Sequence, residues 1–216
     1  MKIGVLGTGM VGSTIGSKLI QLGHEVKMGS RTANNEKAIV WAKDAGSKAS
    51  HGTFTDAAIH GEIIFNCTKG IISLEALSLA GSDNVRGKIL IDLSNPLDFS
   101  KGMPPSLSVC NTDSLGEQIQ KTFPDVKVVK TLNTMNCKLM VDPSLISGSH
   151  MVFMSGNDAD AKIKVKSLLK EFGWNDSHVI DIGDITTARG TEMLLPIWIR
   201  LLGVLGTANF NFSIVK

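Results

Sequence analysis

Short apolar runs alternate with helical patterns along the first part of the chain. Lys2 to Leu6 is an apolar, β-branched run that predicts a strand. A helical pattern begins at a glycine turn and continues to Leu22, where Gly23 closes it. Glu25 to Met28 predicts a second strand, and Gly29-Ser30-Arg31 follows it. The chain therefore begins with a strand, a glycine turn, a helix and a strand.

The same alternation continues as far as residue 132. A helix at 34–45 is expected to bury Ile39, Val40 and Trp41, and Thr55 is expected to cap a short helix that ends at Ile59. Residues 97–111 contain Pro, Gly and Ser and have the length of a lid or binding loop. Strands that alternate with helices in this way favour an α/β fold with a mostly parallel sheet. Further strands are predicted at 48–53, 62–68, 88–93 and 127–132, and further helices at 71–80 and 114–123.

The last third of the chain predicts a short α/β extension and a final apolar helix. The final helix spans 186–205, carries Pro196 inside it, and is apolar nearly all round. Arg200 interrupts its apolar runs, which are too short to span a bilayer. We therefore expect a buried or dimer-interface helix, followed by an apolar tail that docks at 209–215. Before it come a short helical or irregular stretch at 137–146, strands at 151–155 and 178–182, and a helix at 158–172.

Composition narrows the function classes. The 216 residues suffice for one large domain or one and a half, and a net charge of +2 gives no general reason to expect nucleic acid or a membrane as a partner. Cys67, Cys110 and Cys137 are widely spaced, so neither a metal site nor a disulfide framework is predicted. Their odd number and the lack of a leader before the first strand favour a cytoplasmic location. The absence of tyrosine excludes enzymes that protonate a carbonyl with a Tyr-x-x-x-Lys pair.

The glycine turn after the first strand has the spacing of a dinucleotide-binding motif. Gly7 would allow the tight turn, Gly9 would let a pyrophosphate approach the backbone, and Gly12 would let the helix pack close to the sheet. The N–H groups at the start of the helix would then face the phosphates. A purely structural glycine turn is the alternative. The position between a strand and a helix favours the cofactor site and a doubly wound Rossmann sheet.

Ser30 and Arg31 indicate which dinucleotide is bound. NAD enzymes usually place Asp or Glu at the end of the second strand to hold the ribose 2′-hydroxyl, and no carboxylate occurs here before Glu36. A hydroxyl and a guanidinium suit a 2′-phosphate instead, and Thr32 and Asn34 could add donors. The alternative is a solvated turn arginine. The sequence thus favours NADP(H).

Polar residues follow three other strands at the edge where open α/β sheets bind ligands. Thr68 could contact the ribose or a phosphate, whereas Lys69 also fits a solvated loop. Asn95 either contacts the nicotinamide or starts an Asn-Pro turn. No catalytic acid, base or metal ligand is predicted. The candidate cofactor-binding residues are Gly7, Thr8, Gly9, Met10, Val11, Gly12, Ser30, Arg31, Thr32, Asn34, Cys67, Thr68, Lys69, Ser94, Asn95, Pro96, Asn133 and Thr134.

The motifs taken together resemble a known family. Gly7 to Gly12, Gly29-Ser30-Arg31, Ser94-Asn95-Pro96, residues 128–134 and residues 155–158 are similar to the NADPH:deazaflavin (coenzyme F420) oxidoreductases. They are also similar to the cytosolic oxidoreductase domain of the six-transmembrane metalloreductases, and Leu195-Pro196-Ile197-Trp198 matches the end of those domains. The resemblance covers essentially the whole chain. It implies an NADP-binding Rossmann domain at 1–155 and a segment at 156–216 that packs on it and shapes an acceptor cleft.

The resemblance also implies a reaction. Hydride would pass directly between NADP(H), held with its 2′-phosphate on the Ser-Arg pair, and a flavin or deazaflavin ring, so positioning and exclusion of water would suffice. The deazaflavin enzymes carry a His-Thr-Ile-Pro-like turn after the sixth strand, where this chain has residues Asn133 to Asn136. A flavin, a quinone or another small organic acceptor therefore stays open. A homodimer through the C-terminal helix is expected. The alternatives are an NADP(H) sensor without turnover and a reductase of small keto or imino acids.

Overall fold

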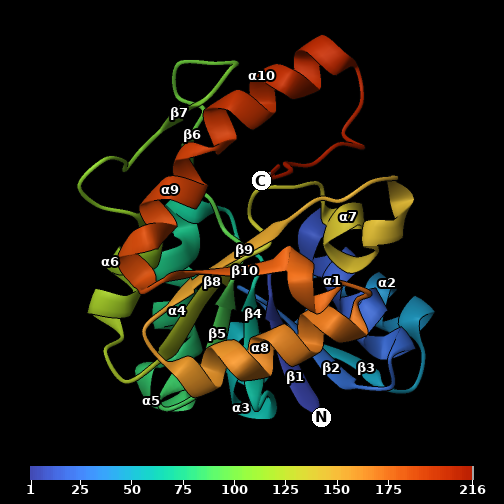
Figure 1. Cartoon of the computed structure of the whole chain (residues 1–216). Coiled ribbons are helices and arrows are strands. Elements are labelled where there is room, and N and C mark those ends of the chain that lie inside the picture. The colour runs from blue at the N-terminus through green and yellow to red at the C-terminus, as the bar shows by residue number, and fades with distance from the viewer. Residues whose placement is uncertain (216) are drawn as a thin grey trace.

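The computed structural model describes residues 1–215 and consists of one eight-stranded sheet with helices on both faces (Figure 1). The strand order is β10-β9-β8-β5-β4-β1-β2-β3, and every neighbouring pair is parallel except β8 and β9. The predicted doubly wound, mostly parallel sheet is confirmed. The strands are β1 Lys2–Leu6, β2 Glu25–Ser30, β3 Ala49–Thr53, β4 Ile63–Asn66, β5 Ile89–Asp92, β8 Lys127–Thr131, β9 Val152–Gly156 and β10 Val179–Gly183.

The chain winds outward from β1 in two directions. It first builds β2 and β3 on one side of β1 and then returns to build β4, β5 and β8 on the other. The strand order therefore reverses between β1 and β4. Crevices at such a switch point, outside the carboxyl ends of the strands, are where open α/β sheets bind ligands.

Two layers of helices bury the two faces of the sheet. Because side chains alternate along a strand, Ile63 and Phe65 of β4 pack on one layer and Ile64 on the other. The first layer holds α1 Met10–Gln21, α2 Glu36–Ala45, α7 Cys137–Val141 and α8 Ala159–Glu171. The second layer holds α3 Phe54–His60, α4 Ser73–Ala80, α5 Ser82–Val85, α6 Leu115–Thr122 and α9 Ala188–Met193.

The predicted single final helix is two helices. The chain breaks at Leu194 between α9 and α10, which spans Leu195–Leu205, and Pro196 lies in the first turn of α10. Proline lacks an N–H and suits the first turn of a helix better than its interior. Within α10 only Leu195 is buried, and Val204 is 82% exposed. The expectation of a buried helix is therefore wrong for α10, and the dimer interface stays a prediction.

Several local expectations also change. Thr53, not Thr55, caps α3 in a capping box with Asp56, because the hydroxyl of Thr55 donates to the carbonyl of Leu79 instead. Of the three residues expected on the buried side of α2, Trp41 is buried, while Ile39 and Val40 are exposed. The loop at 97–111 contains a small antiparallel hairpin, β6 Leu97–Asp98 and β7 Ser106–Leu107.

The tail expected to dock at 209–215 does so at residues 210–212, whereas Ile214 and Val215 are exposed. The N–H of Met151 donates to the carbonyl of Phe212, and the side-chain amide of Asn211 donates to the carbonyl of Met151. The ring of Phe210 stacks on Trp198 of α10, with the ring centres 5.3 Å apart. Among residues 1–215, no helix has the length and apolar character needed to cross a bilayer.

Candidate functional site

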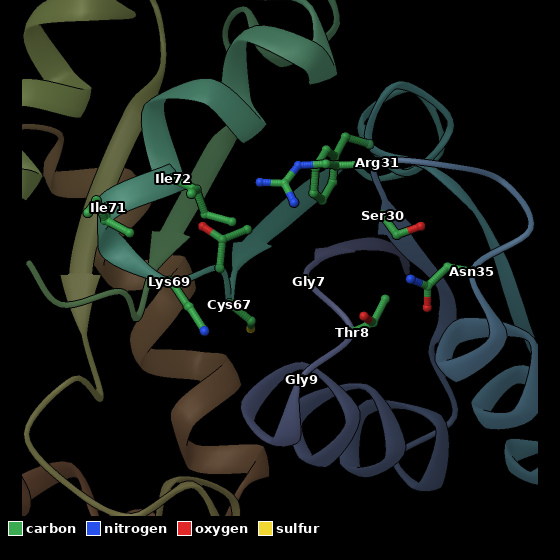
Figure 2. Close-up of a pocket in the computed structure, with 12 residues that line it drawn as sticks. Gly7, Thr8, Gly9, Ser30, Arg31, Asn35, Cys67, Lys69, Ile71 and Ile72 are labelled. Carbon is green, nitrogen blue, oxygen red and sulfur yellow. The ribbon is translucent and has the colours of Figure 1, made fainter. Parts of the chain in front are cut away.

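A cleft of about 500 Å³ lies at the switch point between β1 and β4 (Figure 2). This volume falls within the range of small-molecule and cofactor sites. Its wall comes from the β1–α1 turn, the end of β2, the starts of α2 and α3, the end of β4 and the turn before α4. The lining residues are Gly7, Thr8, Gly9, Ser30, Arg31, Asn35, Phe54, Cys67, Thr68, Lys69, Ile71 and Ile72.

Two of the three motif glycines allow a backbone shape at the β1–α1 turn that larger residues would prevent. Gly7 has a φ of +114°, and a Cβ added there would lie 2.7 Å from the carbonyl oxygen of Cys67. A Cβ on Gly12 would lie only 2.0 Å from the carbonyl oxygen of Gly7. Gly9 differs, because a Cβ there would meet no atom within 4 Å and would project into open space. Gly7 and Gly12 are therefore required by the fold, and Gly9 keeps the approach to the backbone open.

The start of α1 is suited to an anion. Gly9 precedes the helix without any side-chain cap, and its first turn contains no acidic residue. The first N–H groups of a helix have no partner within the helix, and they carry a partial positive charge. A phosphate is the group that such an end binds most readily. The residues present thus fit the pyrophosphate of a dinucleotide.

Arg31 supplies a positive charge on the far side of the cleft from α1. Figure 2 shows its side chain reaching from the end of β2 across the cleft toward Ile72. Its Nε lies 3.4 Å from a carboxylate oxygen of Glu75 on α4, and both side chains are more than half exposed. Ser30 beside it is buried, and its hydroxyl donates to the carbonyl of Thr32. The guanidinium is therefore held loosely and can turn toward a phosphate.

Asn35, rather than Asn34, reaches the cleft from the loop between β2 and α2. Its side chain accepts a hydrogen bond from the N–H of Ala38 and caps α2. Asn34 and Thr32 are exposed and do not line the cleft. The sequence offers two adjacent asparagines, and only the position of the helix start decides which one becomes the cap.

The opposite wall combines a thiol, a hydroxyl and apolar side chains. Burial and the charge of Asp92 raise the pKa of Cys67, so its thiol stays neutral. The hydroxyl of Thr68 lies 2.7 Å from the side-chain oxygen of Asn66, to which it donates. Phe54, Ile71 and Ile72 were not predicted as site residues. Ile71 and Ile72 lie in the turn Gly70–Ile72 that follows β4, and two adjacent apolar residues so soon after a strand end are the sequence signal that could have identified them.

The predicted residues at the ends of β5 and β8 lie outside this cleft but next to each other. The side-chain amide of Asn95 donates to the carbonyl of Asn133, and the amide of Asn133 donates to the side-chain oxygen of Asn95, each over 2.9 Å. The two strand ends are thus joined along the carboxyl edge. Other predicted residues that do not line the cleft are Met10, Val11, Gly12, Ser94, Pro96 and Thr134.

A cluster of three buried charges lies beneath this edge, and sequence reasoning missed it. The ammonium of Lys130 lies 2.8 Å from a carboxylate oxygen of Asp92 and 2.7 Å from one of Glu192, and all three side chains are almost completely buried. Burial by itself lowers the pKa of Lys130, but attraction to Asp92 and Glu192 outweighs burial, and the net effect raises the pKa. Lys130 therefore stays charged. None of the three lines the cleft.

These features define the class of protein. A doubly wound sheet, a glycine turn that opens onto an uncapped helix end, and an arginine in place of the usual acid together form a dinucleotide site suited to the 2′-phosphate of NADP(H).

Comparison with known proteins gives the family. Residues 2–96 match the family model described as "NADP oxidoreductase coenzyme F420-dependent". A crystal structure from Arthrobacter sp. FB24, described as a candidate F420-dependent NADP-reductase, is 56% identical, covers 100% of both chains and has a TM-score of 0.94. The chain belongs to this family of NADP-dependent oxidoreductases.

More distant relatives share the fold or part of the sequence. The chain is 27% identical to the metalloreductase STEAP3 of Rattus norvegicus over 91% of its own length and 38% of that protein. It is 26% identical to the metalloreductase STEAP2 of Homo sapiens over 89% of its own length and 35% of that protein. It thus spans little more than a third of the curated relatives it matches. An imine reductase from Myxococcus stipitatus with NADP⁺ shares the fold, with 19% identity, a TM-score of 0.66, and coverage of 95% of this chain and 64% of the reductase.

Proposed function

We propose that the protein transfers hydride between NADP(H) and a flavin- or deazaflavin-like acceptor. The observation that supports this proposal best is the cleft itself, which pairs an uncapped helix end with the loosely held Arg31. The family description and the Arthrobacter structure point to coenzyme F420 as the type of acceptor. Reduced NADP supplies a hydride when it is bound, so the reaction requires no nucleophile from the protein.

The protein's own residues would bind and orient. The N–H groups at the start of α1 would hold the pyrophosphate, and Arg31 with the Ser30–Thr32 turn would hold the 2′-phosphate. The amide pair of Asn95 and Asn133 lies along the same carboxyl edge and would orient the nicotinamide. The side chains of Asn95 and Asn133 carry no charge, which suits a step in which hydride moves without a proton from the protein.

The C-terminal segment would shape the acceptor side. In Figure 1, α10 and the β6–β7 hairpin rise beyond the carboxyl ends of the central strands, on the same side as the glycine turn. The exposed side chains of α10 include Ile197, Val204 and Leu205, which are apolar. An apolar wall of this kind would exclude water from two stacked rings.

Exposed apolar side chains near the C-terminal end of α10, such as Val204, would pair two copies of the chain. Large exposed apolar patches mark association sites, and a helix this apolar is unusual at a free surface. We expect a homodimer in sedimentation experiments, and we expect Val204→Glu to yield a folded monomer. A monomeric native protein at all concentrations would contradict this arrangement.

The test of the function is NADPH oxidation with a panel of acceptors. Purified protein should oxidise NADPH with coenzyme F420, FMN or riboflavin, and NADH should be a much poorer donor. Tight NADPH binding without turnover on any acceptor would indicate a sensor instead. Turnover only with small keto or imino acids would indicate the third alternative and would refute the proposal.

A further inference from the structure

The three buried charges form a saturated network. The ammonium of Lys130 has three donors, and it gives one each to Asp92, to Glu192 and to the carbonyl of Ser94, over 2.8, 2.7 and 2.6 Å. The carboxylate of Glu192 also accepts from the N–H groups of Leu115 and Gly116 at the start of α6. One positive charge thus faces two negative charges, and the end of α6 offsets part of the excess.

Stability alone gives a weak reason for such a cluster. The cost of removing charges from water can exceed the attraction that they gain on pairing, and well-packed apolar residues are often as stable or more stable. Ile64 of β4, Leu90 of β5 and Val128 of β8 face the second helix layer with apolar side chains. Near the carboxyl ends of these three strands the buried positions are polar instead, namely Asn66, Asp92 and Lys130. These ends form the edge of the sheet where the cofactor is proposed to bind.

One arm of the network leads to the cleft. The second oxygen of Asp92 accepts from the side-chain amide of Asn66 over 2.8 Å, and the carbonyl oxygen of that amide group accepts from the hydroxyl of Thr68 over 2.7 Å. Thr68 lines the cleft. Lys130 also binds the carbonyl of Ser94, the residue before Asn95. The ends of β4 and β5 are therefore fixed from below through Lys130 and Asp92.

The other arm leads to the C-terminal segment. Glu192 lies on α9, and only Leu194 separates α9 from α10. Its two carboxylate oxygens tie α9 both to Lys130 of β8 and to the start of α6. The helix that carries the proposed acceptor wall is thus anchored on the same ammonium group as the proposed cofactor edge.

We propose that Lys130 is a positioning residue that holds the cofactor edge and the α9–α10 segment in one fixed relation. This inference rests on the proposed function for its kinetic consequence, but the mechanical link is testable without turnover. Hydride transfer depends steeply on the alignment of donor and acceptor, so loosening the link should slow the hydride step while the phosphate end of NADPH stays bound.

Glu192→Gln is the informative variant. Lys130→Met would leave two buried carboxylates facing each other and is expected to unfold the chain. Glu192→Gln instead leaves a neutral Lys130–Asp92 pair. The matched control is Arg189→Met, which removes an ion pair between the same two helices, α9 and α6, through Glu117, without contacting the buried cluster.

Hydrogen exchange in the full-length protein tests the link itself. In Glu192→Gln, amide protection should fall about tenfold both in residues 188–205 and at the ends of β4 and β5, residues 66–68 and 92–95. In Arg189→Met the loss should be confined to α9 and α6. Unchanged protection at the two strand ends in Glu192→Gln, or the same losses in both variants, would overturn the proposal.

Kinetics then test the consequence. With NADPH deuterated at the transferred position, Glu192→Gln should lower kcat about tenfold and raise the isotope effect, with the Kd for NADPH within about twofold of the native value. Arg189→Met should keep kcat and the isotope effect. A kcat that follows only the melting temperature in both variants would overturn the positioning role. Absence of turnover in the native protein with every acceptor would refute the proposed function instead, and the exchange result would still decide the link.

Discussion

Replacing Arg31 with alanine is the sharpest test of the cofactor assignment. The guanidinium is more than half exposed and its ion-pair contact within 4 Å, among the residues described, is the 3.4 Å approach to Glu75. A hydrogen bond to a charged group contributes about 1.5–3 kcal/mol. Breaking an exposed ion pair to release the guanidinium costs about 0.5 kcal/mol. The net contribution to NADPH binding is therefore about 1–2.5 kcal/mol, or about fivefold to seventyfold in Kd.

The measurement is a titration of NADPH and NADH, followed by fluorescence or calorimetry, on native and Arg31→Ala proteins. NADPH binding should weaken by the amount above, and NADH binding should hardly change because NADH lacks the 2′-phosphate. The control is Arg86→Ala, which removes a similarly exposed arginine that pairs with Asp83 before β5, at the other end of the sheet. Equal losses for both cofactors, or an effect of Arg86→Ala as large as that of Arg31→Ala, would refute the reasoning.

Three further predictions follow from the same contacts. Gly9→Ala should fold normally but bind NADPH at least tenfold more weakly, because its new methyl group points into open space where the phosphates would lie. Gly12→Ala should instead lower the melting temperature strongly, because its Cβ would lie 2.0 Å from a carbonyl oxygen. Binding titrations and thermal melts distinguish the two variants, and a Gly9→Ala protein that binds NADPH tightly would contradict the site. Glu75→Gln should tighten NADPH binding by about twofold to fivefold, because the Glu75 carboxylate competes with the 2′-phosphate for Arg31 and would repel that phosphate. Weaker binding in the same titration would show that Glu75 orients Arg31 instead. The hydrogen bond from Arg189 depresses the pKa of Glu117, so this ion pair should stabilise the fold above the ordinary pKa of the carboxyl and lose its effect as the pH falls through the depressed value. Arg189→Met should therefore lower the melting temperature at neutral pH, and the difference from the native protein should narrow in acid. A difference in melting temperature that does not depend on pH would contradict the role of this ion pair.

The sequence predicts the sheet well because its strands are buried on both faces. A parallel strand covered by helices appears as a short continuous apolar run, and Ile63 to Asn66 and Ile89 to Asp92 do so. The glycine turn and Arg31 are also local signals, since each lies within a few residues of the strand it follows. The break at Leu194 was missed because a helical pattern with one proline fits either a kinked helix or two helices.

The rest of the site depends on contacts that no local pattern contains. Asp92 and Lys130 become neighbours only because β5 and β8 pair in the register that sets these two residues side by side. Glu192 joins them from α9, which lies about sixty residues after Lys130 and one hundred after Asp92 in the chain. Charged residues at the end of β5 and within β8 were the available signal, but they did not reveal which charges would meet. Phe54 reaches the cleft in the same way, through packing rather than spacing.

The mutual dependence of Lys130, Asp92 and Glu192 also limits how this lineage can change. Loss of Lys130 would leave two buried carboxylates without their cation, so replacement of Lys130 should be accompanied by replacement of Asp92 and Glu192 rather than occur as a single step. A descendant that abandoned the trio for apolar residues would have to replace β5, β8 and α9 positions almost together. These three sites should therefore change together, whereas exposed positions outside the cluster can change one at a time.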